Sequence, residues 1–248
     1  MSKKKISIIV IILGILLLGI GLVLMFTDKE SGEKPKDPPK EPTVIESKYI
    51  ESLNPSDDLV QSLYYKTKGY WYGDYDDNSY YYYKTDKLLV SDFEKVYLYN
   101  LVFERIYKKD LLSDNLTVKE DDVKAEFEDI FGSYVTYSKI DSFSNGCYHV
   151  MYDNVSSQYK YLLTNGCVGL LKVLSEVTAA HRYTDKIVIE ESVLFSDGFD
   201  YYYDVDLTKK SNSTMIDVND SNILKYNYTF MYDNNLDKYF FYSIEKVK

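Results

Sequence analysis

The pattern of hydrophobic and polar positions divides the chain into three stretches. Residues 6–26 form an apolar run without a charged side chain, residues 27–43 are polar and proline-rich, and residues 44–248 mix apolar and polar positions. A helix over the apolar run would be roughly 31 Å long, which matches a bilayer core of about 30 Å. Because a helix satisfies its own backbone groups in hydrocarbon, the pattern predicts a transmembrane helix over residues 6–26.

Charges beside this run predict its orientation. Lys3–Lys5 precede it in the short tail 1–5, whereas residues of both signs follow it. Positive flanks stay in the cytoplasm, so we expect the tail inside and residues 44–248 outside. The run is longer than the apolar region of a signal peptide, and it ends in the bulky Leu24-Met25-Phe26 rather than in small residues. We therefore expect an uncleaved anchor in the cell membrane, with the lipid bilayer as its partner.

The segment that follows the anchor has the composition of a spacer. Residues 27–43 hold four of the chain's five prolines and alternate acidic with basic side chains. Such a sequence buries nothing, and proline stiffens it toward polyproline II. We expect a disordered tether that spans about 50 Å when it is fully extended.

Helical periodicity comes first in the outer stretch. Asn54-Pro55-Ser56 can start a helix whose apolar positions Leu59, Val60, Leu63 and Tyr64 share one face. Ser91 with Glu94 and Thr117 with Glu120 have the spacing of capping boxes, which predicts two further amphipathic helices. Their buried faces are expected to hold Phe93, Val96, Tyr97, Leu101 and Ile106 in the first and Val123, Phe127, Ile130 and Phe131 in the second. Gly132 stands where a left-handed helix cap is wanted.

Beyond Gly132 the period changes to two, which is typical of strands. The predicted strands are Tyr134–Ile140, Cys147–Asp153, Gln158–Leu163, Lys186–Phe195, a segment containing Tyr226, Tyr228, Phe230 and Tyr232 on one face, and Lys238–Lys246. Asn-Gly pairs at 145–146 and 165–166 and Asp233-Asn234-Asn235 predict turns. Leu170–Arg182 fits a helix or a strand, and we favour a strand because Thr184-Asp185 would then make a hairpin.

The sum of these elements is an α+β domain, with a few helices packed on an antiparallel sheet. A cystatin-like or nuclear-transport-factor-like cone is one form that such a domain takes.

Charge and aromatic content narrow the possible partners. Of the 29 Lys+Arg and 39 Asp+Glu, seven and five precede residue 44, so the outer domain holds 22 and 34 and its formal charge is about −12. This charge disfavours nucleic acid, which needs a clustered basic footprint. All 28 tyrosines lie in this domain. Their rings can serve packing in the core or stack against carbohydrate.

The order of these parts resembles a known kind of protein. Lys3–Lys5, the 6–26 anchor, the proline-rich tether and an acidic, tyrosine-rich outer domain occur together in uncharacterised single-pass surface proteins of low-GC Gram-positive bacteria. The resemblance implies a compartment and a broad class of organism. It implies no activity and no site residues.

The two cysteines are the clearest candidates for covalent chemistry. Cys147 and Cys167 each follow an Asn-Gly pair, and the predicted orientation places them on the oxidising side of the membrane. An even cysteine count in that compartment favours a disulfide, although two buried thiols or a cysteine nucleophile beside His149 or His181 stay open. The disulfide would close a 21-residue loop and stabilise the domain by roughly 3 kcal/mol.

Motifs for metals and cofactors are weak, and we expect neither. His149 and His181 lack metal-ligand spacing. Asp74-Tyr75-Asp76-Asp77-Asn78 opens like a calcium loop, but its sixth position is Ser79 rather than glycine and its twelfth is Thr85 rather than glutamate. No phosphate-binding glycine loop or nucleophile elbow is present in the sequence.

Three classes of function follow. The first is a membrane-anchored binding or interaction domain with a protein or envelope polymer as its unknown partner, and it is the one we favour. The second is an envelope-structural component, whose sheet would be filled by its own tyrosines. The third is a cell-wall-modifying enzyme, for which the sequence supplies no catalytic signature.

Overall fold

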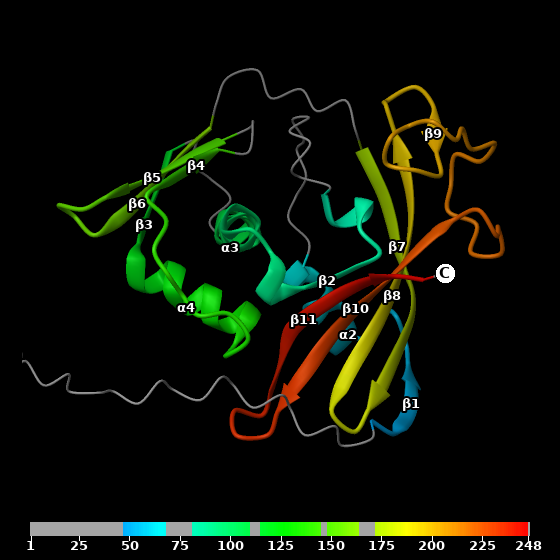
Figure 1. Cartoon of the computed structure of the whole chain (residues 1–248), viewed down its shortest axis with the longest axis horizontal. Coiled ribbons are helices and arrows are strands. Elements are labelled where there is room, and N and C mark those ends of the chain that lie inside the picture. The colour runs from blue at the N-terminus through cyan, green and yellow to red at the C-terminus, as the bar shows by residue number, and fades with distance from the viewer. Residues whose placement is uncertain (1–46, 68–80, 110–114, 145–147, 164–171, 248) are drawn as a thin grey trace, which may run out of the picture. The chain divides into compact units, whose positions relative to one another are not determined.

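Alternating side chains in the last third of the chain build the larger of two antiparallel sheets (Figure 1). The structure is a computed structural model, and it describes residues 47–67, 81–109, 115–144, 148–163 and 172–247. In the described residues the larger sheet has seven strands in the order β1-β7-β8-β10-β11-β2, with β9 paired to β8. Its strands are β1 (Tyr49–Leu53), β2 (Lys87–Leu89), β7 (Lys172–Tyr183), β8 (Lys186–Ser196), β9 (Tyr201–Tyr202), β10 (Leu224–Asp233) and β11 (Lys238–Lys246).

Side chains alternate between the two faces of this sheet, so the period of two shows which residues share its buried face. On β8, Ile187, Ile189 and Val193 are fully buried, and Tyr226 and Tyr228 on β10 are buried with them. These residues form the inner face of the sheet. A smaller cluster of Leu194, Tyr203 and Ile223 packs apart from this core.

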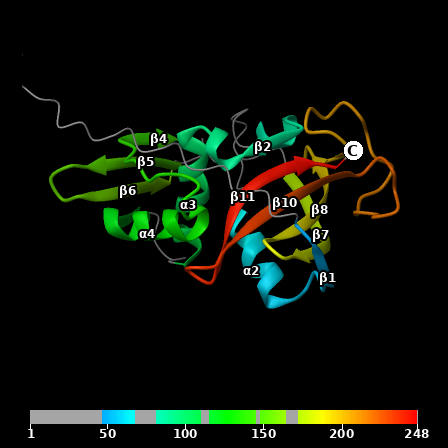
Figure 2. The same cartoon turned by 60° about the horizontal axis from the view of Figure 1, so that its bottom comes forward.

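Helix α2 (Asp58–Thr67) packs on the inner face of the larger sheet (Figure 2). Its Val60, Leu63 and Tyr64 are buried, and the ring of Tyr64 meets the ring of Tyr228 edge to face at 6.0 Å. The predicted helix is therefore confirmed, because its apolar stripe covers the sheet. Two short 3-10 helices, η1 (Tyr81–Lys84) and η2 (Val90–Asp92), flank β2.

The smaller sheet packs with the other two helices. Among the described residues it has four strands in the order β3-β6-β5-β4. They are β3 (Asn115–Lys119), β4 (Ser142–Ser144), β5 (Tyr148–Asp153) and β6 (Gln158–Leu163), and the helices are α3 (Lys95–Lys109) and α4 (Glu120–Phe131). Phe103 on α3 contacts Tyr159 on β6 edge to face at 5.4 Å, and Tyr148 stacks on Tyr161 at 4.4 Å. The predicted α+β class is thus confirmed in its coarse form.

Tyrosine supplies many of the core residues in the described chain. Six tyrosines are among its largest fully buried side chains: Tyr99, Tyr148, Tyr159, Tyr161, Tyr226 and Tyr228. Each hydroxyl can find an internal partner while the ring is buried. Tyr99, for example, donates to the carbonyl of Ser138 at 3.0 Å, and Tyr226 donates to that of Tyr83 at 2.8 Å.

The two capping boxes were wrong, although both helices are present. Thr117 lies in β3, paired with Lys160, so Lys119 becomes the residue before α4 and makes no side-chain cap. Ser91 lies in η2, and the carbonyl of Glu94 accepts the first helical bond, from the amide of Tyr97 at 3.0 Å. In both places the residue expected to cap the helix belongs to the preceding strand or 3-10 helix instead.

The strand predicted over Tyr134–Ile140 was also wrong, since this segment is irregular. Its Tyr134, Val135 and Tyr137 pack partly buried against the core. Its carbonyls are bonded by side chains instead of by a neighbouring strand, as when Lys95 donates to the carbonyl of Lys139. The period of two in this segment therefore reflects packing against the helices and not pairing with another strand.

The other strand predictions hold in the described residues. Leu170–Arg182 is a strand from Lys172 onward, and it forms the expected hairpin with β8 through Thr184-Asp185. β10 and β11 pair around the predicted turn, where Asp233 accepts the amide of Asn235 at 2.8 Å. The described residues belong to one compact unit, Ser47–Lys248, in which no described helix has the length and apolarity to cross a bilayer. The predicted anchor at 6–26 and tether at 27–43 lie outside the described residues.

Candidate functional site

A pocket opens between α3 and the inner face of the larger sheet. The space between its walls is about 350 Å³ when the part open to solvent is counted, and the enclosed part has room for about one water molecule. The lining consists of Thr67, Phe93, Tyr97, Asn100, Leu101, Tyr228, Phe241 and Ile244. Four of these residues carry aromatic rings, so the walls are largely apolar.

Five elements of the chain bring this lining together. Thr67 is the last residue of α2, and Phe93 follows η2 directly. Tyr97, Asn100 and Leu101 occupy one stripe of α3, because residues three and four apart share a face. β10 and β11 contribute Tyr228, Phe241 and Ile244 from the inner face of the sheet.

Asn100 is the polar exception in this wall. It is only 4% exposed, and its Oδ1 accepts a hydrogen bond from the hydroxyl of Tyr148 at 3.1 Å. Asn100 therefore adds one buried amide side chain to a largely apolar wall.

A buried carboxylate lies next to the pocket. Glu191 on β8 is fully buried, and it accepts from the hydroxyls of Tyr64 at 2.6 Å and of the pocket residue Tyr228 at 2.6 Å. Tyr83 donates to it as well, at 3.3 Å. A buried carboxylate needs several such donors, and the tyrosines supply them. The cluster therefore fixes the ring of Tyr228 at one wall of the pocket.

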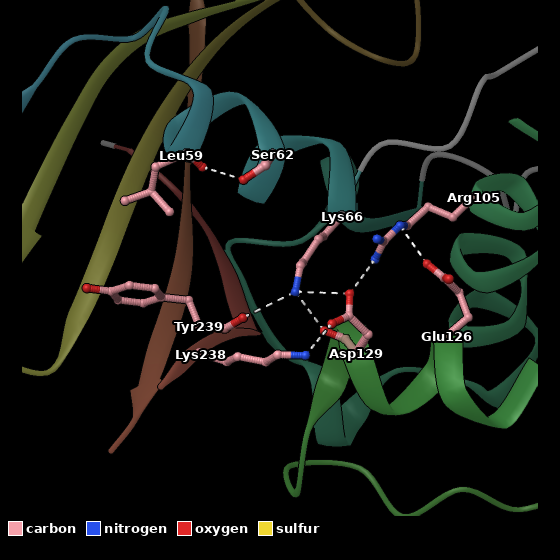
Figure 3. Close-up of polar contacts among 8 residues, drawn as sticks. All are labelled: Leu59, Ser62, Lys66, Arg105, Glu126, Asp129, Lys238 and Tyr239. Atoms are coloured by element: carbon pink, nitrogen blue, oxygen red, sulfur yellow. Dashed lines mark hydrogen bonds and ion pairs between the residues drawn. The ribbon is translucent and has the colours of Figure 1, made fainter. Parts of the chain in front are cut away.

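An ion-pair cluster joins the helices to β11 (Figure 3). Lys66 on α2 donates to the carbonyl of Asp129 at 2.8 Å, and its Nζ lies 3.3 Å from the Asp129 carboxylate. Arg105 on α3 donates to the same carboxylate at 3.2 Å, and Lys238 on β11 lies 3.3 Å from it. Arg105 also pairs with Glu126 at 2.7 Å.

Partial burial shifts the pKa values of two residues in this cluster, Asp129 and Lys66. Burial raises the pKa of Asp129, but the charges of Lys66 and Arg105 outweigh it, so the pKa lies below its ordinary value. The pKa of Lys66 is also lowered, because loss of solvent outweighs the attraction of Asp129. The carboxylate therefore gains from the pairing, while the ammonium group is destabilised by its burial. All partners in the cluster are internal, so its role is to hold α2, α3, α4 and β11 together.

The residues singled out from the sequence do not meet in the described structure. Cys147 and Cys167 lie outside the described residues, as do Asp74–Ser79 of the calcium-like loop. His149 is on β5, within 2.5 Å of the Ser144 hydroxyl, whereas His181 is on β7 of the other sheet. No group of three or more His, Cys, Asp or Glu side chains in the described ranges is placed to hold a metal ion.

Sequence reasoning missed Asn100 and Glu191, although a signal was present for both. Asn100 falls between Tyr97 and Leu101 on the apolar stripe of a predicted helix. Glu191 falls on the buried face of a predicted strand, two residues from Ile189 and from Val193. A polar residue at a position that the period assigns to the core is a candidate for function or for an internal network.

Comparison with protein-family models, with curated proteins and with solved structures gives no match for this chain.

Proposed function

We propose that the protein is a membrane-anchored, extracytoplasmic binding domain whose ligand site is the pocket between α3 and the larger sheet. The observation that carries the proposal is the pocket itself, which combines largely apolar walls with the buried amide side chain of Asn100. Few precisely placed polar groups in an apolar cavity are typical of small-molecule sites. The described residues of the lining include no carboxylate, histidine or cysteine, and we propose binding without catalysis.

Anchoring and orientation rest on the sequence. The 6–26 helix would hold the protein in the membrane, and the 27–43 tether would place residues 44–248 beyond the lipid surface. Protease added to wall-stripped cells with intact membranes should then remove the outer domain. Protection of the domain until the cells are lysed would reverse the orientation.

The form of the larger sheet supports a cone of the cystatin-like or nuclear-transport-factor-like kind. Register shifts place one extra residue in each of β1, β7 and β11, and such bulges bend a sheet. We base the likeness to such a cone on this bent sheet with a helix on its inner face, as an analogy of fold alone.

Binding can be tested with an apolar probe of suitable size. The full-length protein in phosphatidylcholine nanodiscs is titrated with sec-butylbenzene, and empty nanodiscs correct for partition into lipid. We expect one saturable site that Ile244→Phe, which fills the pocket, weakens at least tenfold. Leu101→Ala, which enlarges the pocket, should retain the site. Val155→Phe serves as the control, because Val155 is 97% exposed in the β5–β6 turn. Unchanged binding in Ile244→Phe would place the site elsewhere.

An envelope-structural component is the second candidate, and a specific observation favours it. Away from the pocket, aromatic rings fill the inner face of the sheet, as where Tyr83 meets Tyr226 at 4.9 Å and Phe195 at 5.4 Å. A purely structural domain would bind no small apolar probe, so the same titration separates the two candidates.

A further inference from the structure

Two hairpin turns of the larger sheet lie at the end where the chain enters it (Figure 1). They are Thr184-Asp185 between β7 and β8 and residues 233–237 between β10 and β11, and β1 begins beside the first of them. The amide of Tyr232 donates to the carbonyl of Asp185 at 2.9 Å, which joins the two turns. Ser47, the first described residue, donates to the carboxylate of Asp185. The predicted tether therefore joins the domain here, and we call residues 47–51, 182–186 and 232–239 the tether end.

We infer that the tether end rests on the lipid surface, with its exposed apolar side chains at the level of the headgroups. The domain then lies on the membrane instead of standing away from it. This inference goes beyond the proposed function, but it rests on the membrane anchor that the proposed function includes.

Large apolar side chains at the tether end face solvent. Tyr49 is 56% exposed, Ile50 is 53% exposed and Leu236 is 60% exposed. Tyr183, whose ring meets that of Tyr49 edge to face at 5.8 Å, and Tyr232 are partly exposed beside them. Tyrosine joins an apolar ring to a polar hydroxyl, a combination that is enriched where a membrane meets water. The side chains of this end are thus of the kind that a bilayer interface accepts.

Charge also distinguishes the tether end from the rest of the domain. Residues 44–248 carry a formal charge of about −12, whereas the tether end is neutral. Its charged residues are Lys48, Arg182, Lys186 and Lys238 with Glu51, Asp185, Asp233 and Asp237. Lysine can lay its methylene groups along an apolar surface while its ammonium group stays among the headgroups. Lipid contact at this end therefore brings no excess of acidic groups to the bilayer.

The opposite end of the sheet is the competing surface. Residues 197–222 connect β8 to β10 there, and they include the exposed Phe199 and Met215. Exposed apolar side chains alone therefore do not choose between the ends. This segment holds six acidic and two basic residues, so its formal charge is −4, and acidic groups lose solvation at a lipid surface. The 11 residues of β8 separate the two ends by about 35 Å, so both ends cannot lie on the lipid together.

The tether makes a weak contact sufficient. Full extension of the tether limits the height of the domain above the lipid to about 50 Å, and no minimum height follows from its length. A surface held this close by a linker meets the membrane at an effective concentration on the order of millimolar. Because the tether joins at Ser47, the tether end is the part of the domain that is held nearest to the bilayer.

Tryptophan quenching by brominated lipid tests the contact. The full-length protein is placed in nanodiscs of phosphatidylcholine with bromine on its acyl chains, which quenches an indole only at short range. Leu236→Trp puts an indole at the tether end, and Phe199→Trp puts the same indole at the opposite end. The parent protein, whose one tryptophan is Trp71, gives the background. Quenching in Leu236→Trp should exceed that in Phe199→Trp at least about threefold, because interfacial side chains enter the headgroup boundary.

A second substitution tests the tether end itself. Ile50→Asp adds a carboxylate beside the tryptophan of Leu236→Trp and should lower its quenching at least about twofold, because the contact loses apolar area and gains a charge. Tyr49→Asp should act in the same way. Val155→Asp is the matched control, since Val155 is 97% exposed in the β5–β6 turn of the other sheet, and it should leave the quenching unchanged. Circular dichroism of these variants should match that of the parent, because all three positions are exposed.

The outcomes separate the anchor from the contact. If the protein does not elute together with nanodiscs, the membrane anchor is refuted and this inference fails with it. If it elutes with them but Leu236→Trp is not quenched, or is quenched no more than Phe199→Trp, only the lipid contact is overturned. Equal loss of quenching in Ile50→Asp and Val155→Asp would show that net charge, and not the tether end, governs the approach to lipid, and would also overturn the inference.

Discussion

Gly132 is the residue at which one added methyl group should disturb the domain most clearly. It ends α4 with φ +54° and ψ −133°, a backbone conformation that residues other than glycine rarely adopt. A Cβ atom built there would lie 2.6 Å from Cγ of Phe240 and within 2.9 Å of two further ring atoms. Phe240 is 3% exposed, so its ring has little room to move aside.

Two physical effects add in Gly132→Ala. Strain in the disfavoured backbone region is worth about 1–3 kcal/mol. Overpacking against the Phe240 ring is worth about 1–3 kcal/mol more. The sum, about 2–6 kcal/mol, is a large part of the roughly 5–15 kcal/mol by which a domain is stable. The free energy of unfolding is measured by urea titration of residues 44–248, followed by circular dichroism.

The chain offers a matched control for the backbone effect. Gly198 also has a positive φ, +93°, but an added Cβ would meet nothing within 4 Å. Gly198→Ala should therefore cost only the strain, about 1–2 kcal/mol. Phe240→Leu combined with Gly132→Ala should recover part of the loss, because it frees space beside the new methyl group. A Gly132→Ala cost within about 0.5 kcal/mol of that of Gly198→Ala would refute the clash.

Three further predictions concern the buried charges and the thiols. Glu191→Leu should destabilise the domain by about 2–5 kcal/mol in urea titration, because the hydroxyls of Tyr64, Tyr228 and Tyr83 lose an acceptor. A cost no larger than that of an exposed substitution such as Val155→Ala would contradict the network. Asp129→Asn should cost roughly 1–2 kcal/mol at neutral pH, since its carboxylate is only partly buried. Because the pKa of Asp129 is lower in the folded state, its carboxylate stabilises the fold above the ordinary Asp pKa near 4, and this contribution is lost as the pH falls through the folded-state pKa. The free energies of unfolding at pH 6 and pH 3 should therefore differ less in Asp129→Asn than in the wild-type protein. Alkylation of the unreduced, unfolded protein should find no free thiol if Cys147 and Cys167 are bonded, and two reactive thiols would exclude the bond.

Elements with a strong local period could be predicted from the sequence. α2, α3, α4 and the long strands β8, β10 and β11 each carry enough apolar positions to reveal their face, whereas the segment of β7 fitted a helix as well as a strand. The short edge strands β1, β2 and β9 were missed, because two to five residues hold too little pattern. Their pairing depends on partners that are distant in sequence, as Tyr49 pairs with Tyr183.

The pocket could not be predicted for the same reason. Its lining runs from Thr67 to Ile244 and comes from five elements, so no local window contains it. The predicted helix caps were wrong because tertiary contacts took precedence over local capping. Thr117, for example, pairs in the β3–β6 ladder instead of capping α4. Asn100 and Glu191 could have been recognised from the sequence as polar residues at apolar positions. Their hydrogen-bond partners could not be predicted, since Tyr148 and Tyr64 approach from other elements.

Photo-crosslinking tests the central claim, that the pocket beside α3 is the ligand site, most directly. An alkylbenzene with a diazirine group is irradiated with the full-length protein in nanodiscs, and the labelled residues are mapped by peptide mass spectrometry. We expect labels on pocket residues such as Tyr97, Leu101 and Ile244, which excess sec-butylbenzene removes. Labels that spare these residues, or that excess sec-butylbenzene does not reduce, would contradict the claim.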